Sequence, residues 1–103
     1  MSFAYTVIAN FSDPALVDRY LAWLQREHLA DVCAAGAESA EVVRIDGDKA
    51  QLEVRYRFSS RAAYDAYLRD HAPRLRAAGL ALFPPESGLS YQRTSGEIVA
   101  AWP

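Results

Sequence analysis

Residues 50–58 alternate between apolar and polar side chains without interruption. Because the side chains of a strand point alternately to its two faces, this period of two predicts a strand with one apolar face and one charged face. A strand of this kind is typical of an antiparallel sheet that is covered on one side only. The apolar positions are Ala50, Leu52, Val54, Tyr56 and Phe58, and the polar positions are Gln51, Glu53, Arg55 and Arg57.

Three further segments are predicted to complete a four-stranded sheet. Residues 3–11 show the same alternation and form the first strand. Residues 37–45 form the second, joined to 50–58 by a hairpin turn at Asp46-Gly47-Asp48, because Asp and Gly tolerate the positive φ of such turns. The last strand is expected over 89–99, with a β-bulge at Gly96.

Two helical regions separate these strands. In the first, a cap at Ser12 or Asp13 precedes a helix that is expected to bend near His28 and to end at Gly36. The second starts from a cap at Ser59 or Ser60, and Pro73 permits a further helical segment over 74–83. The apolar stripes that define the two regions are Val17, Tyr20, Leu21, Leu24 and His28, and Tyr64, Tyr67, Leu68 and His71.

The two helical regions resemble each other. Residues 20–28 and 64–71 both carry an aromatic-Leu pair followed by a basic-acidic-His triplet, and an Ala-Ala-Gly sequence closes each region. The spacing differs by a single residue. Such a repeat is expected of a split βαβ fold, so residues 1–103 are predicted to form one α+β domain. This domain is ferredoxin-like, βαββαβ, with a four-stranded antiparallel sheet and its helices on one face.

Composition argues against several classes of function. The 103 residues carry a net charge of −2, so no general basic field attracts nucleic acid or an anionic membrane, and no apolar run is long enough to span a bilayer. A lone Cys33 with two histidines builds no metal framework, and neither metal nor cofactor is expected. The N-terminus has the pattern of a strand and not of a signal peptide, which predicts a cytoplasmic protein.

The chain as a whole resembles a family of bacterial proteins of about this length that is described only as a domain of unknown function. The resemblance covers nearly the whole chain and is carried by residues 23–28, Gly36, 56–58, 64–67 and 71–76. It places the chain in the dimeric α/β barrel superfamily, where two ferredoxin-like subunits pack sheet against sheet. It therefore implies a homodimer formed through the sheet faces, without a known substrate.

Characterised relatives at the superfamily level include antibiotic-biosynthesis-type monooxygenases, muconolactone isomerases and haem-degrading enzymes. No set of their catalytic residues is found in this sequence. Kinship at the level of the fold is a weak argument for function.

His28 and His71 are the first candidate site residues, because an imidazole transfers protons near neutral pH. Both end an apolar helical stripe, a position that would direct them into a cleft at the rim of the sheet. The alternative is that each ring caps its helix by donating to terminal carbonyls. The sequence leaves open whether the two rings converge.

The polar face of 50–58 is the second candidate, through Arg55 and Arg57, joined by Glu41, Tyr91 and Arg93 from other strands. If two sheets close into a barrel, these side chains line its interior, where an arginine binds a carboxylate through two hydrogen bonds. A small anionic or polar ligand is then predicted. The alternative is a solvated sheet face or a set of salt bridges between subunits.

The leading hypothesis is a homodimeric small-molecule-binding or accessory protein of the dimeric α/β barrel type. The alternative is a cofactor-independent enzyme of the monooxygenase or isomerase kind, acting on a small aromatic or polar metabolite. A purely structural interaction module is a third class. The sequence alone leaves open whether the chain is an enzyme.

Overall fold

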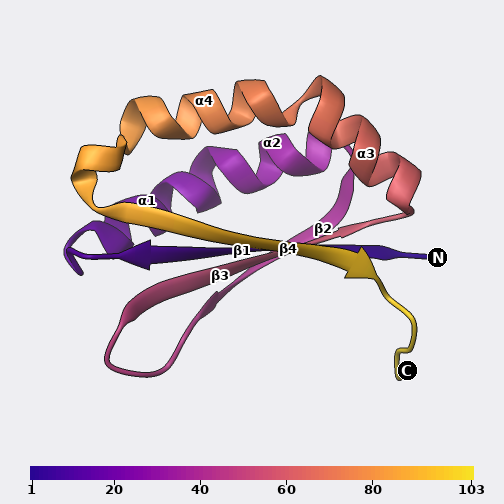
Figure 1. The fold of residues 1–103 in the computed structure, drawn as a ribbon, viewed down its shortest axis with the longest axis horizontal. Helices are drawn as coiled ribbons and strands as arrows, with labels where there is room; N and C mark the ends of the chain where they lie inside the picture. Colours follow the sequence, from indigo (N-terminus) through magenta and orange to yellow (C-terminus); the bar gives the residue numbers. More distant parts are fainter.

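The computed structural model describes residues 1–103, which form a four-stranded antiparallel sheet in the order β2-β3-β1-β4. All helices lie on one face of this sheet (Figure 1). The arrangement is that of a ferredoxin-like βαββαβ fold and confirms the prediction. The elements are β1 (Phe3–Phe11), α1 (Leu16–Trp23), the π-helix η1 (Leu24–His28), α2 (Leu29–Ala34), β2 (Ala37–Arg44), β3 (Ala50–Phe58), α3 (Arg61–Asp70), α4 (Ala72–Leu82), the 3-10 helix η2 (Pro85–Ser87) and β4 (Leu89–Glu97).

Strands β1 and β3 form the centre of the sheet, and both follow the predicted alternation. They pair in regular register from Phe3 opposite Phe58 to Phe11 opposite Ala50. Alternate residues of each strand point toward the helices, and β1 shows a strict change between buried and half-buried positions. Burial of these apolar rows supplies the main stabilisation of the sheet, at about 25 cal/mol for each Å² removed from water.

The helix starts and the bend near His28 are explained by local hydrogen bonds. The hydroxyl of Ser60 accepts a hydrogen bond from the backbone N–H of Ala63 at 3.1 Å, which confirms the cap of α3. Before α1, the carboxylate of Asp13 accepts from the N–H of Ala15 at 3.0 Å. Within η1 the helix widens into a π turn that ends at His28, the position near which the sequence predicts a bend.

Several predicted boundaries are wrong by one or two residues. β2 ends at Arg44, and β4 ends at Glu97. Gly96 pairs with Ala4 in regular register, so the bulge predicted there is absent, and the irregularity in the sheet lies in β2 between residues 37 and 39. α4 begins at Ala72, before the expected residue 74, because a proline needs no hydrogen-bonded N–H in the first helical turn.

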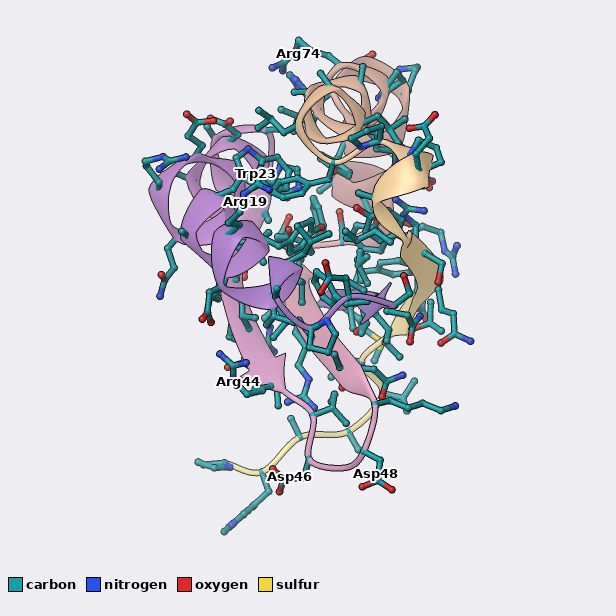
Figure 2. The ribbon with its side chains drawn as sticks, turned by 90° about the vertical axis from the view of Figure 1, so that its left-hand side faces the viewer. Arg19, Trp23, Arg44, Asp46, Asp48 and Arg74 are labelled. Atoms are coloured by element: carbon teal, nitrogen blue, oxygen red, sulfur yellow. The ribbon has the colours of Figure 1, made fainter.

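The opposite face of the sheet carries no helix. Only the turn between β2 and β3 and the segment after β4 extend to that side (Figure 1). The outer face defined in this way has a mixed composition, with Ile8 of β1 between Glu53 of β3 and Gln92 of β4. On the helical side, Figure 2 shows the space between sheet and helices filled with side chains, Trp23 among them. No helix of the structure has both the length and the apolar character needed to cross a bilayer.

Candidate functional site

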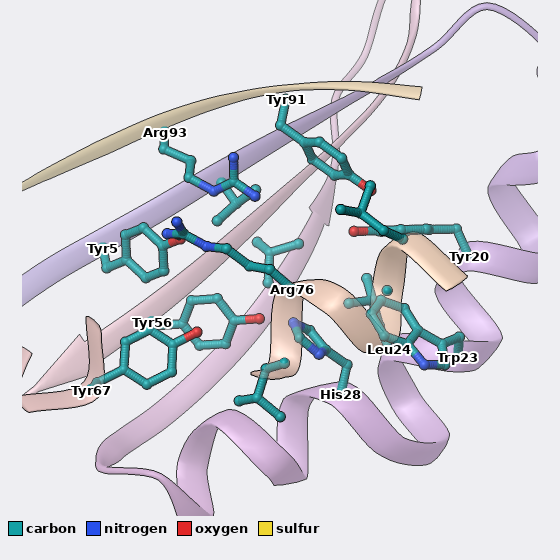
Figure 3. Close-up of a pocket in the computed structure, with 15 residues that line it drawn as sticks. Tyr5, Tyr20, Trp23, Leu24, His28, Tyr56, Tyr67, Arg76, Tyr91 and Arg93 are labelled. Atoms are coloured by element: carbon teal, nitrogen blue, oxygen red, sulfur yellow. The ribbon is translucent and has the colours of Figure 1, made fainter. Parts of the chain in front are cut away.

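A cavity of about 250 Å³ lies between the helices and the covered face of the sheet. Strands β1, β3 and β4 form its floor, and α1, η1, α3 and α4 form its roof and walls (Figure 3). Most of its lining is aromatic or aliphatic, with a few polar groups that point inward. Ligand sites in proteins are built in this way, with apolar walls and a small number of convergent polar groups.

His28 enters the cavity because of the π turn. In a regular α-helix a residue five positions along lies about 140° further around the axis, on another face. In η1 the N–H of Leu29 instead donates to the carbonyl of Leu24, five residues back, and the wider turn brings His28 over Trp23. The two rings stack with their centroids 4.4 Å apart and their planes at 21°. The stack fixes the imidazole at the cavity wall.

Burial keeps the imidazole of His28 neutral near neutral pH. Loss of hydration lowers the pKa of His28 below its ordinary value, and the opposing effect of Asp31 is smaller. A neutral imidazole carries one nitrogen that accepts a proton and one that donates a hydrogen bond. His28 can therefore accept a proton from a bound molecule or orient it by a hydrogen bond.

Tyrosine hydroxyls supply further polar groups in the cavity. Burial raises the pKa of Tyr56 and Tyr20, and it raises the pKa of Tyr67 to about 12, so all three stay protonated. No buried polar side-chain atom lacks a hydrogen-bond partner. The hydroxyls of Tyr56 and Tyr67 form no hydrogen bond within the chain. Since no unpaired polar atom is buried, these two hydroxyls are accessible from the cavity and can donate to a ligand.

Two arginines reach the same cavity from different elements. Arg76 of α4 donates a hydrogen bond from Nη2 to the hydroxyl of Tyr5 at 3.1 Å. The guanidinium of Arg93, on β4, lies 5.1 Å from the centre of the Tyr91 ring. No carboxylate lines the cavity, so the site is apolar with a positive edge.

The structure brings together three of the predicted site residues and separates the other three. His28, Tyr91 and Arg93 line the cavity, whereas His71, Arg55 and Arg57 do not. The prediction that Tyr91 and Arg93 share a face with Arg55 is wrong. The β1 pairing shows the reason, because Arg93 is opposite the core residue Val7 and Arg55 is opposite Thr6 on the outer face.

The two histidines do not converge on one site. His71 lies at the break between α3 and α4, where the guanidinium of Arg74 donates to its Nδ1 at 3.0 Å. Neither ring donates to a carbonyl at a helix end, so the capping alternative is also wrong. The repeated sequence places the two rings in different surroundings.

The arginines of β3 belong to the outer face. Arg55 donates to the carboxylate of Glu53 at 3.1 Å and lies 3.6 Å from that of Glu41. These pairs are exposed, and solvent screening leaves exposed pairs of this kind with little effect on stability. Arg55 is therefore paired within the chain on the outer face.

The sequence did not identify Arg76, Trp23 or the tyrosines other than Tyr91 as parts of the site. Trp23 was missed because it lies five residues before His28, and two residues at this spacing are on different faces of a regular α-helix. A signal for Arg76 existed, since Gly79 and Leu80 follow it at i+3 and i+4 and complete one face of α4. An arginine on a face that is otherwise small and apolar is a candidate for a ligand contact. No group of three or more His, Cys, Asp or Glu side chains gathers as a set of metal ligands.

Comparisons with solved structures support the fold over the full length. A dimeric ferredoxin-like protein from an uncultured marine organism is similar with a TM-score of 0.79 at 11% identity, covering 100% of this chain and 99% of that one. SnoaB, a cofactor-independent oxygenase from Streptomyces nogalater, has a TM-score of 0.69 at 12% identity, with 99% and 97% covered. HapK from Hahella chejuensis has a TM-score of 0.65 at 22% identity, with 100% and 98% covered.

These similarities show the fold, since all the identities are low. Among curated proteins none matches the sequence. The family comparison is more specific, and it confirms the resemblance seen in the sequence. The profile described as "Domain of unknown function (DUF4286)" matches residues 3–93, nearly the whole chain, and the protein belongs to that family.

Proposed function

We propose that this chain is a homodimeric protein that binds a small, flat and largely apolar molecule in the cavity between helices and sheet. The cavity itself is the observation that carries this proposal, because aromatic walls with few polar groups suit a planar ring. Its volume of about 250 Å³ is smaller than the roughly 300–1,000 Å³ typical of sites for drug-sized molecules. A ligand of one or two rings fits this size.

The homodimer is supported by the uncovered sheet face and by the neighbours. Two solved structures with the same fold are described as dimeric ferredoxin-like proteins. In this chain the outer face includes Ile8, Val43 and Thr94 among its polar side chains, a mixture that a second copy can cover. Pairing through this face leaves the cavity free on the helical side of each subunit.

Two leucines of α4 allow the cavity to be tested with a matched control. Leu80 lines the cavity and is 49% exposed, whereas Leu82 is 51% exposed and lies outside it. A Leu80→Trp side chain is expected to fill the mouth and to weaken binding at least tenfold. Leu82→Trp adds the same surface and should change nothing. Titration calorimetry with cinnamyl alcohol, indole and 2-naphthol as neutral probes measures this.

Two results would count against the cavity. One is that none of these probes binds to the unaltered protein. The other is that a probe binds with equal affinity to both leucine variants, which would place it elsewhere on the surface.

The second candidate is a cofactor-independent enzyme acting on an aromatic substrate, and the half-buried, neutral His28 in the cavity wall favours it. The likeness to the oxygenase SnoaB adds a further reason. In such a reaction His28 would accept the proton of a phenol, and the electron-rich phenolate would then be oxidised by molecular oxygen. Oxygen uptake with dihydroxynaphthalenes above the uncatalysed rate, abolished by His28→Gln, is the expected result. Unchanged uptake in this variant would leave binding as the function.

A further inference from the structure

We infer that the cavity selects aromatic carboxylates, with Arg76 and Arg93 binding the carboxylate at the mouth and the aromatic walls contacting the ring. This inference rests on the proposed function and specifies the chemical class of the ligand. It also moves the anionic ligand that the sequence predicts from the outer face of β3 to the opposite side of the sheet.

The two guanidinium groups converge although they belong to distant parts of the chain. Arg76 comes from α4 and Arg93 from β4, and Figure 3 shows both side chains directed to the same end of the cavity, beside Tyr5. The bond from Nη2 of Arg76 to the hydroxyl of Tyr5, at 3.1 Å, orients this guanidinium and leaves its other N–H groups free. Arg93 has a different support, because its guanidinium lies over the ring of Tyr91 in a cation–π contact.

Neither guanidinium has a counter-charge. Arg44, Arg55 and Arg69 each lie within 4.0 Å of a carboxylate, but Arg76 and Arg93 do not, and the cavity lining contains neither Asp nor Glu. Two unneutralised cations near one another favour a bound anion. A guanidinium also matches a carboxylate geometrically, because its planar N–H groups can bond to both oxygens.

The remaining lining determines which anion fits. A bare inorganic anion would leave the aromatic end of the cavity empty, and burying its charge there would cost free energy without a compensating bond. Arg76 and Arg93 are both exposed, so a carboxylate bound to them stays partly hydrated at the mouth. The ring then lies inside, against Trp23, His28 and Tyr56. An aromatic monocarboxylate satisfies both ends.

Three probes separate charge from shape. Cinnamate carries ring and carboxylate, cinnamyl alcohol has the same ring without the charge, and acetate has the charge without the ring. Titration calorimetry is expected to show cinnamate binding about tenfold more tightly than the alcohol, because hydrogen bonds from a guanidinium to a carboxylate are stronger than those to a neutral hydroxyl. Acetate should bind more weakly than either.

Substitutions in α4 and β4 assign the effect to the two arginines. Arg76→Gln combined with Arg93→Gln is expected to lower the affinity for cinnamate to that for cinnamyl alcohol and to leave the alcohol unaffected. Arg74→Gln is the control, because Arg74 is on the same helix and contacts His71 outside the cavity. An equal loss in this control would mean that net charge, and not the cavity, causes the preference.

The position of the probe is read from Trp23. The chain has two tryptophans, so a ¹⁵N-labelled Trp102→Phe protein has a single indole N–H resonance, from Trp23 in the cavity wall. Both cinnamate and the alcohol should shift it. Equal affinities with a shifted resonance would keep the binding cavity and overturn carboxylate selection. No shift with either probe would overturn both, and arginine-dependent binding without a shift would place the anion outside the cavity.

Discussion

His28 is the residue whose surroundings differ most from those expected of a helical histidine. The sequence identifies it as the end of an apolar stripe, but not its stacking on Trp23, because two residues five apart lie on different faces of an α-helix. Only the π turn of η1 brings the rings to 4.4 Å. The interaction depends on backbone geometry that the apolar pattern does not contain.

The lowered pKa of His28 predicts how stability depends on pH. The folded protein binds this proton less readily than the unfolded chain, whose histidine has a pKa of about 6.5. The free energy of unfolding should therefore be highest above that pH and should fall as the pH decreases through it toward the lower folded value. Urea unfolding at about pH 7.5 and about pH 5 is the measurement. His28→Gln is the reference protein. The carboxylates titrate in both the variant and the unaltered chain, so the difference between their losses of stability isolates the imidazole of His28.

His28→Gln should lose less stability over this interval than the unaltered chain. An identical loss in the two proteins would show that His28 is hydrated in the folded state.

Arg93 illustrates why part of the site was assigned to the wrong face. Strand β4 begins with the buried Leu89, and most of the residues after it are polar, so its sequence does not show which face meets the core. In β3 the alternation settles the question for every residue. Where a strand lacks that contrast, the faces are set by pairing with its neighbour, here β1.

The one-residue difference between the two copies of the helical repeat falls in η1. The first copy has one residue more than the second between its Leu and its His, and this stretch coincides with η1 (Leu24–His28). A π turn accommodates one extra residue in a helix without changing the faces on either side. In the second copy the helix breaks at His71 instead, with φ −130° and ψ −38°. The single-residue difference between the two copies therefore coincides with the π turn.

Two single-residue deletions test this account of η1. Deleting Gln25, which is exposed within the π turn, should convert the turn to α-helix and leave the free energy of unfolding nearly unchanged. Deleting Ala22, which is also exposed but precedes Trp23, rotates the buried Trp23 and Leu24 by about 100°. That variant should lose about 3 to 5 kcal/mol, the cost of removing a large aromatic side chain from a core.

Urea unfolding with circular dichroism measures both deletions. Equal destabilisation would mean that Gln25 is not the extra residue of the repeat.

At the scale of the molecule, the topology could be predicted and the cavity could not. Four strands and two helical regions follow from periodicity, caps and turns, all of which are local in sequence. The cavity needs Trp23, Tyr56, Arg76 and Arg93 from four different elements, and its shape depends on how closely the helices approach the sheet. At Gly79 of α4 a methyl group would come within 3.1 Å of the Trp23 ring. The shape of the cavity therefore depends on close approaches between helices that the sequence pattern does not show.

The proposed dimer can be tested on the central strand of the outer face. Ile8→Lys places a charge opposite Glu53, where a cross-strand pair is favourable for the subunit, while the charge opposes burial by a second sheet. The unaltered protein should have twice the 11.4 kDa mass of the chain in light scattering, and the variant the mass of one chain. Leu82→Lys on α4 is the control and should remain dimeric. A monomer in the unaltered protein at micromolar concentration contradicts the proposal.

The alternation along β1 and β3 has a consequence for how such a protein can change. Buried and outward positions alternate along both strands. Each face of the sheet is therefore formed by its own set of residues, every second one in the sequence. A library that varies Tyr5, Val7, Val54 and Tyr56 alters what the cavity accepts and leaves Thr6, Ile8, Glu53 and Arg55 as they are. If the proposed ligand binding and pairing hold, ligand preference and subunit pairing are separable traits, and each can diverge while the other is kept.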